Sequence, residues 1–350
     1  MFAEIHRKSL ILCLSVFIFA QVTALMLAES IRPALNNNVD VQKNQDYIKW
    51  VDFNVSYEAL CDTMEADISS YQTENHYVWT DLLAYLASTN GNNFSGYTKH
   101  SLSSLTEKLD SGKTMEELTE NLKYYPYYKE AFTAILGEYI GEYYTQSFCE
   151  DPDIPVWEKR YGLKVFCPIA KGFSFEHYKD FGNSRSYGYS RRHTGHDLFG
   201  GIGTPVVAIE SGTVESVGWN RYGGWRIGIR SLDKKRYYYY AHLRKNHPYT
   251  PIVKEGARIN AGDVIGYLGM TGYSAEENVN NINVPHLHMG IQLIFDEAQK
   301  EGPAEIWIDC YNILRLLQKN CCEVYKREEM GEYIRKYGFY EGKISEVIKP

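Results

Sequence analysis

The sequence predicts an α+β protein with a helical N-terminal domain, a glycine-rich antiparallel β domain and a short helical C-terminal tail. Apolar residues recur every three or four positions from about residue 45 to 145, which is helical spacing. After residue 151, short apolar runs alternate with glycines, and beyond residue 303 the helical spacing returns. We therefore expect domains at residues 33–150, 151–302 and 303–350, preceded by a separate segment at 1–32.

The first segment is predicted to be a signal anchor. Residues 9–28 contain no charged side chain, and Arg7 and Lys8 precede them. An uncharged helix of this length can cross about 30 Å of hydrocarbon, and the basic residues favour a cytoplasmic N-terminus. We expect a single membrane span with the rest of the chain outside the cytoplasm. Cleavage near Ala24, followed by secretion, is the alternative.

The region 33–150 combines a polar linker, marked by Pro33 and an asparagine run, with a helical accessory domain. Thr114 followed by Glu117 predicts the start of a helix with a capping box. Pro126 predicts the start of the next helix, which the apolar spacing extends to residue 144. One face of the first helix is predicted to hold four apolar or aromatic residues, Tyr57, Leu60, Met64 and Ile68.

The region 151–302 predicts short strands at residues 204–219, 225–231 and 235–243. Turns are expected at Gly203, at Gly212 and at the pair Gly223 and Gly224. Regular short strands separated by glycine turns are typical of an antiparallel barrel or sandwich. The segments 305–320 and 323–338 then predict helices in the C-terminal tail.

Composition excludes some functions. The net charge of −7 gives no electrostatic case for nucleic-acid binding. Cys13 lies in the apolar leader, and no C-x-x-C spacing occurs, so a thiolate zinc site is not expected. The pairing of the remaining cysteines stays open. The 30 tyrosines suit either carbohydrate and peptide contact or half-buried packing.

Two short strings contain the candidate chemistry: HTGHD at residues 193–197 and PHLHMG at 285–290. Imidazole and carboxylate are ligand types that zinc takes from proteins. On extended chain, His193 shares a face with Asp197, and His286 shares one with His288. A helical zinc motif is not expected in the first string, because the glycines at and after 195 disfavour a helix.

These strings and His242 together predict a catalytic metal site. Three protein ligands leave an open position on zinc, whereas four ligands close the site. With three ligands in use, two histidines remain for proton transfer, so the set predicts a hydrolase. Tyr238 and Tyr240 would share a strand face with His242, where they would line a groove or pack into the core.

The chain resembles the lysostaphin/LytM-type zinc endopeptidases, which cut bacterial peptidoglycan. The motifs at residues 191–214, 237–243, 253–274 and 285–291 follow the order of that family, and the resemblance covers about residues 165–295. It implies a duplicated hybrid motif fold, a glycine-rich antiparallel β core with the metal in a groove. Met289 stands where an aromatic residue is usual, and an asparagine-rich insert precedes the histidine pair.

The resemblance also implies roles for individual residues. One zinc ion is expected on His193, Asp197 and His288, with peptidoglycan peptide as substrate. His286 is assigned as general base and acid, and His242 as the group that hydrogen-bonds the oxyanion.

Two residues beside the first string remain. His196 is expected to have a supporting or structural role, because its odd offset from His193 turns it away on extended chain. Tyr187 matches the position of a tyrosine that is thought to contact the intermediate in some relatives, although Tyr189 is as near.

The alternative function is a non-catalytic peptidoglycan-binding or regulatory scaffold of the same fold, since some relatives lose the ligands. All five expected site residues are present here, which favours the enzyme. A cross-bridge and a stem-peptide bond both fit as the bond cut, and the oligomeric state is open.

Overall fold

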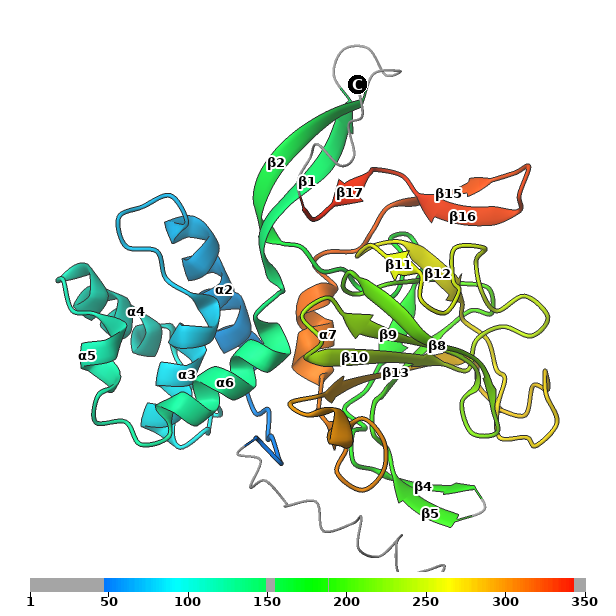
Figure 1. Cartoon of the computed structure of the whole chain (residues 1–350), viewed down its shortest axis with the longest axis horizontal. Coiled ribbons are helices and arrows are strands. Elements are labelled where there is room, and N and C mark those ends of the chain that lie inside the picture. The colour runs from blue at the N-terminus through cyan, green and yellow to red at the C-terminus, as the bar shows by residue number, and fades with distance from the viewer. Residues whose placement is uncertain (1–46, 149–154, 188, 343–350) are drawn as a thin grey trace, which may run out of the picture. The chain divides into compact units, whose positions relative to one another are not determined.

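The computed structural model describes residues 47–148, 155–187 and 189–342 (Figure 1). The chain from Ile48 onward forms one compact unit, to which the following description refers. The predicted anchor at residues 9–28 lies outside the described residues. Among the helices in the described ranges, none has both the length and the apolar character that a membrane span needs.

The N-terminal part of this unit is helical, as the apolar spacing predicts. In the first helix, Leu60 and Met64 are buried, and the Ser56 hydroxyl accepts a hydrogen bond from the Ala59 N–H. The predicted capping box of Thr114 and Glu117 is also confirmed. The helices are α2 (Tyr57–Ser70), α3 (Trp79–Asn90), α4 (Lys99–Asp110), α5 (Met115–Thr119) and α6 (Tyr125–Leu136).

The prediction that the last helix reaches residue 144 is wrong. Helix α6 ends at Leu136, and Gly137 follows it. The chain then forms β1 (Ile140–Phe148), which pairs antiparallel with β2 (Pro155–Leu163). Hydrogen bonding to a partner strand has outweighed local helical spacing here. Because β1 and β2 pair across it, the expected boundary at residue 150 does not separate two domains.

The main sheet is antiparallel, as predicted, with the strand order β11–β8–β9–β10–β13–β6–β3 and with β14 paired to β13. Its strands are β3 (Phe175–His177), β6 (His196–Gly200), β8 (Gly212–Asn220), β9 (Gly224–Ser231), β10 (Arg236–Ala241), β11 (Arg258–Ile259), β13 (His286–Leu293) and β14 (Ile306–Trp307).

Smaller two-stranded sheets flank the main one. One pairs β7 (Pro205–Val207) with β12 (Val264–Tyr267), and a hairpin pairs β4 (Ser184–Tyr187) with β5 (Tyr189–Arg192). Strands β7 to β10 overlap the three segments predicted as strands. A short 3₁₀ helix, η1 (Glu297–Gln299), lies between β13 and β14.

The C-terminal tail is only partly helical, so the prediction of a helix at residues 323–338 is wrong. Helix α7 (Tyr311–Leu317) lies inside the first predicted helix. After it come β15 (Val324–Arg327) and β16 (Glu332–Arg335), which form a hairpin, and β17 (Phe339–Tyr340), which pairs with β1. Gly331 has a φ of 67°, a left-handed conformation that a right-handed helix through this segment could not contain.

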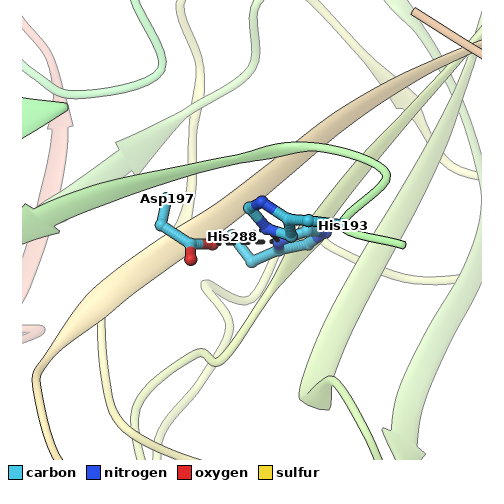
Figure 2. A group of neighbouring side chains, drawn as sticks. All are labelled: His193, Asp197 and His288. Carbon is cyan, nitrogen blue, oxygen red and sulfur yellow. Dashed lines mark hydrogen bonds and ion pairs between the residues drawn. The ribbon is translucent and has the colours of Figure 1, made fainter. Parts of the chain in front are cut away.

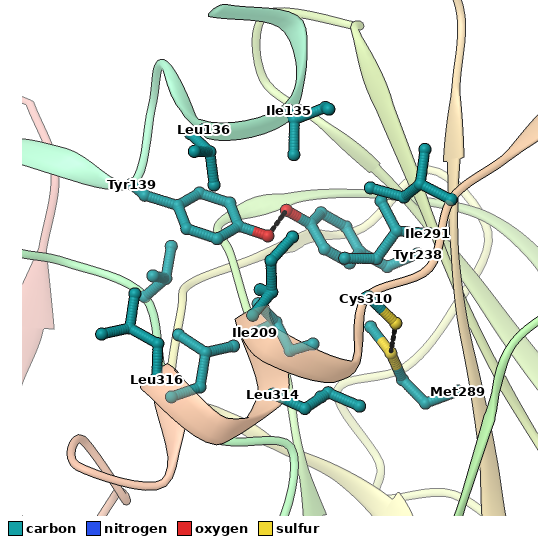
Figure 3. Close-up of a cluster of buried hydrophobic side chains, with 14 of the residues drawn as sticks. Ile135, Leu136, Tyr139, Ile209, Tyr238, Met289, Ile291, Cys310, Leu314 and Leu316 are labelled. Atoms are coloured by element: carbon teal, nitrogen blue, oxygen red, sulfur yellow. Dashed lines mark hydrogen bonds between the residues drawn. The ribbon is translucent and has the colours of Figure 1, made fainter. Parts of the chain in front are cut away.

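One continuous hydrophobic core joins the helices to the main sheet. Figure 3 shows Leu136 of α6, Ile291 of β13 and Leu314 of α7 in this core. Met289, which stands where an aromatic residue was expected, is fully buried, and the Cys310 thiol contacts its sulfur at 4.0 Å.

A buried polar network crosses the same core. The Arg236 guanidinium, which is fully buried, donates to both carboxylate oxygens of Glu210 at 2.8 and 3.0 Å. It also donates to the Ala134 carbonyl of α6 at 2.5 Å. The Tyr238 hydroxyl donates to Glu210 and lies 3.2 Å from the hydroxyl of Tyr139 (Figure 3). This network fixes α6 against β10, the strand that leads to His242.

Candidate metal centre

Strand register brings the predicted site residues together. Strand β13 lies between β6 and β10, and His288 on β13 pairs directly with Asp197 on β6. On its other side, His288 pairs with Ala241, the residue before His242. His193 lies in the link between β5 and β6.

Three side-chain atoms converge in this place, and Figure 2 shows them. Nε2 of His193 lies 3.0 Å from Oδ1 of Asp197 and 2.9 Å from Nδ1 of His288. Nδ1 of His288 lies 3.1 Å from the same Asp197 oxygen. Three lone-pair atoms so close together repel one another unless a proton or a cation lies between them. The donor set of two imidazoles and a carboxylate therefore fits a divalent metal ion.

Asp180 and Arg185 orient two of these donors, and sequence reasoning missed both. Nδ1 of His193 lies 3.1 Å from the Asp180 carbonyl and 3.2 Å from its carboxylate, so it donates a proton there, and Nε2 is the nitrogen on which a metal ion would replace the second proton. Arg185 donates to Asp180 at 2.9 Å and to Oδ2 of Asp197 at 3.0 Å, which leaves Oδ1 for the metal. No motif marks either residue, because only the folded chain places them here.

The electrostatics of the centre favour a positive charge. Burial by itself lowers the pKa of His193, but hydrogen bonds to Asp180 and Asp197 outweigh burial and raise this pKa to about 9. Burial raises the pKa of Asp180, yet its hydrogen bonds to His193 and His196 bring that pKa down to about 2. The carboxylates thus stay ionised and stabilise a cation at this position, whether imidazolium or metal.

His196 has the supporting position that was expected of it. It is fully buried, and its two ring nitrogens face Oδ1 of Asp180 at 3.1 Å and Oδ1 of Asp309 at 2.9 Å. Burial lowers its pKa, but the two carboxylates raise it by a larger amount. The imidazole of His196 thus positions the carboxylate of Asp180, which in turn positions the imidazole of His193.

His242 and His286 present the same ring nitrogen to the centre. Nδ1 of His242 donates to the Thr271 carbonyl at 2.8 Å, and Nδ1 of His286 donates to the Val284 carbonyl at 2.8 Å. In the neutral form of both rings Nε2 is therefore the nitrogen without a proton. The two ring centres are 4.8 Å apart, and Nε2 of His286 lies 3.6 Å from Oδ1 of Asp197.

His242 also has an unusual backbone. Its φ of 61° lies in the left-handed region, which is uncommon for a residue other than glycine. Its backbone N–H donates to the Gly223 carbonyl at 2.7 Å, and this bond holds the conformation. Burial, and then the nearby His286 and His288, lowers the pKa of its imidazole well below the usual value, so the ring stays neutral at rest.

A groove of about 460 Å³ opens over the centre. Tyr239 of β10 lines it, with its ring 5.9 Å from that of His288. Tyr238 and Tyr240 point to the opposite face and are fully buried in the core. They do not share a face with His242, because His242 follows the end of the strand in a left-handed conformation. The Tyr187 ring stacks, with 5.0 Å between ring centres, on that of Tyr273, which lines the groove.

Gly195 within the first string explains why that string passes so close to β13. A Cβ atom at this position would lie 2.5 Å from the Met289 carbonyl oxygen and 2.8 Å from Cε1 of His288. Both distances are shorter than real Cβ contacts allow, so a side chain here would displace His288.

We therefore expect Gly195→Ala to weaken metal binding by about tenfold or more, because the displaced imidazole loses its place in the donor set. Gly201→Ala is the matched control, since its Cβ would meet only the Thr204 hydroxyl at 3.8 Å. Metal titration of both variants checks this. Equal metal affinity in the Gly195 variant and the parent would contradict the packing argument.

Comparison with known proteins finds a family model that matches the part of the chain around this site. Residues 191–300 match peptidase family M23. The chain is 39% identical over 152 residues to the L-Ala--D-Glu endopeptidase of Bacillus subtilis, covering 43% of each sequence. It is 42% identical over 97 residues to lysostaphin of Staphylococcus staphylolyticus, covering 27% of this chain and 18% of that protein.

The chain thus spans less than half the length of either relative. A solved structure of a lytM protein from Ruminococcus gnavus has a similar fold, with a TM-score of 0.50 and 23% identity over 79% of this chain and 92% of that one. Residues 191–300 thus match the model of peptidase family M23, in the part of the chain where the sequence motifs lie.

Proposed function

We propose that this chain is a zinc-dependent endopeptidase that hydrolyses peptide bonds of bacterial peptidoglycan. The observation that supports this most strongly is the pair of unprotonated Nε2 atoms, on His242 and His286, beside the His193–Asp197–His288 donor set. A non-catalytic scaffold of the same fold has no need for these two imidazoles.

Three residues would hold the metal: His193 through Nε2, Asp197 through Oδ1 and His288 through Nδ1. Zinc held in this way would lower the pKa of a water molecule to near 7 and would polarise the carbonyl that is attacked. Arg185 and Asp180 keep the ligand atoms aimed and correctly protonated.

His286 is assigned as the proton carrier. Its Nδ1 is committed to the Val284 carbonyl, so Nε2 is the atom that accepts a proton from water and delivers it to the leaving amine. His242 is assigned as the partner of the oxyanion. Because its Nδ1 already donates to Thr271, this role requires that Nε2 takes up a proton from solvent, and the developing negative charge would stabilise the resulting imidazolium.

The substrate class follows from the resemblance of the motifs to lysostaphin/LytM-type enzymes and from the groove. Its lining combines tyrosines, arginines and acidic residues, including Tyr222, Arg191 and Glu305. Such a surface suits an extended polar peptide better than an apolar ligand.

Loss of a ligand should remove metal and activity together. We expect Asp197→Ala and His288→Ala to lose zinc at a concentration that saturates the parent with one ion per chain, because two ligands hold a catalytic ion poorly. His100→Ala removes an exposed imidazole from α4 and serves as the control. Metal analysis beside a muropeptide cleavage assay makes the measurement, and full zinc occupancy in either variant would disprove the ligand assignment.

Loss of a proton-transfer group should leave the metal in place. We expect His242→Ala and His286→Ala to keep zinc and lower kcat by about 100- to 1000-fold, since each group acts on the transition state. The same two assays separate these variants from the ligand variants. A variant that is folded but free of metal would show that its histidine is a ligand.

We also propose that residues 9–28 anchor the chain in the cell membrane, with the M23 domain outside the cytoplasm. Their uncharged length and the preceding Arg7 and Lys8 support this. Such an anchor would confine cutting to the wall within reach of the linker. Cell fractionation and N-terminal sequencing make the test: membrane-bound protein with an intact leader is expected, and soluble protein that begins near Leu25 would refute the anchor.

A further inference from the structure

We propose that Arg191 forms a carboxylate-binding subsite in the groove, and that it selects acidic stem peptides over neutral glycine cross-bridges. This inference rests on the proposed peptidase function and names its substrate class. It starts from the charge of Arg191, which no described residue balances.

The two buried arginines of the described residues are paired with carboxylates. Arg236 pairs with Glu210, and Arg230 pairs with Glu297 at 2.6 Å. Arg191 lines the groove and is half-buried, yet no hydrogen bond or ion pair joins its guanidinium to another residue in the described ranges. Its Nη1 is shielded from water and has no acceptor. An unsatisfied buried donor is costly, and a charged one more so, which a bound anion would relieve.

Aromatic rings hold this guanidinium in place. It lies 5.0 Å from the ring centre of Tyr222 and 5.2 Å from that of Tyr273. Tyr187 stacks on Tyr273 and contacts Tyr222 edge to face, so the rings support one another. Contact with ring faces leaves the in-plane N–H donors of a guanidinium free, and those other than the covered Nη1 are available for a carboxylate in the groove. The site is therefore built before any ligand arrives.

The subsite is close to the reacting centre. The Tyr273 ring that contacts Arg191 is also 5.7 Å from the ring of His242. Arg191 itself precedes the ligand His193 by two residues. Each residue of an extended substrate spans about 3.3 to 3.6 Å, so a carboxylate held by Arg191 belongs to a residue within a few positions of the bond that is cut.

The charged residues that line the groove favour one orientation of a bound peptide. Arg191 and Arg192 lie on β5, whereas Glu301 and Glu305 line the groove near β14. A carboxylate is attracted to the arginine side and repelled from the glutamate side. A glycine cross-bridge offers no carboxylate along its length. When bound in the groove, it would leave Arg191 without a partner and shielded from water.

The test compares three synthetic substrates with the full chain: a stem peptide with free carboxylates, the same peptide with the carboxylates amidated, and pentaglycine. We expect kcat/KM for the free acid to exceed that for the amide by about 10- to 100-fold, the range of a charged hydrogen bond. Arg191→Gln should abolish this preference mainly through KM, and Arg191→Lys should restore part of it.

Arg221→Gln is the matched control, because Arg221 contacts the same Tyr222 ring at 5.4 Å but does not line the groove. This variant should keep the preference for the free acid. Three outcomes would overturn the subsite. The parent could cleave the free acid and the amide with equal kcat/KM, Arg191→Gln could lower kcat/KM equally for both peptides, or the parent could cleave pentaglycine faster than the free acid.

Calorimetry of peptide binding separates failure of the subsite from failure of the proposed function. If the metal-loaded chain cuts none of the peptides, the peptidase function fails. Tighter binding of the acid than of the amide, lost in Arg191→Gln, would still support the subsite, and equal binding of the two peptides would disprove it.

Discussion

The antiparallel register of β13 between β6 and β10 is the constraint on which the metal centre depends. It places His288 opposite Asp197 on one side and opposite Ala241 on the other. Because side chains alternate between the faces of a strand, a slip of one residue would turn His288 away from the groove. The buried Arg236–Glu210 pair and the core between α6, β13 and α7 hold this register.

The candidate metal centre also contains several buried charges that must balance one another. Asp180, Asp197 and Asp309 surround His193 and His196, and burial alone would favour their neutral forms. Mutual hydrogen bonds keep the carboxylates ionised, so this part of the chain is prepared for a cation. Arg185 neutralises the outer side of Asp197 and leaves its inner oxygen to the donor set.

The two remaining imidazoles show how the fold sets chemistry through the backbone. Carbonyl groups of Thr271 and Val284 each take an Nδ1 proton, so Nε2 is free in both rings. Gly224 makes this arrangement possible beside His242. A Cβ at Gly224 would lie 2.4 Å from the Thr271 carbonyl carbon, so the turn before β9 can approach only without a side chain. The tautomer of His242 therefore depends on a loop far from it in sequence, whereas that of His286 depends on a carbonyl two residues before it.

Sequence alone predicted the α+β class, the helical start and the glycine-rich strands, and the resemblance of its motifs to lysostaphin/LytM-type enzymes implied the three residues that converge in the candidate metal centre. These are local signals, since residue type, strand periodicity and glycine turns act within a few positions. Tertiary structure decided the rest. Strand β1 and the hairpin at residues 324–335 formed where helical spacing predicted helices, because pairing with distant partners outweighed local preference.

The supporting residues of the site follow the same rule. Asp180, Arg185 and Asp309 carry no motif, and Tyr238 and Tyr240 entered the core because His242 left the strand in a left-handed conformation. Arg191 stands beside His193 in the sequence, but only the fold shows that it has two aromatic neighbours and no carboxylate among the described residues. Residue identity thus indicated the candidate ligands, while long-range packing specified their orientation and surroundings.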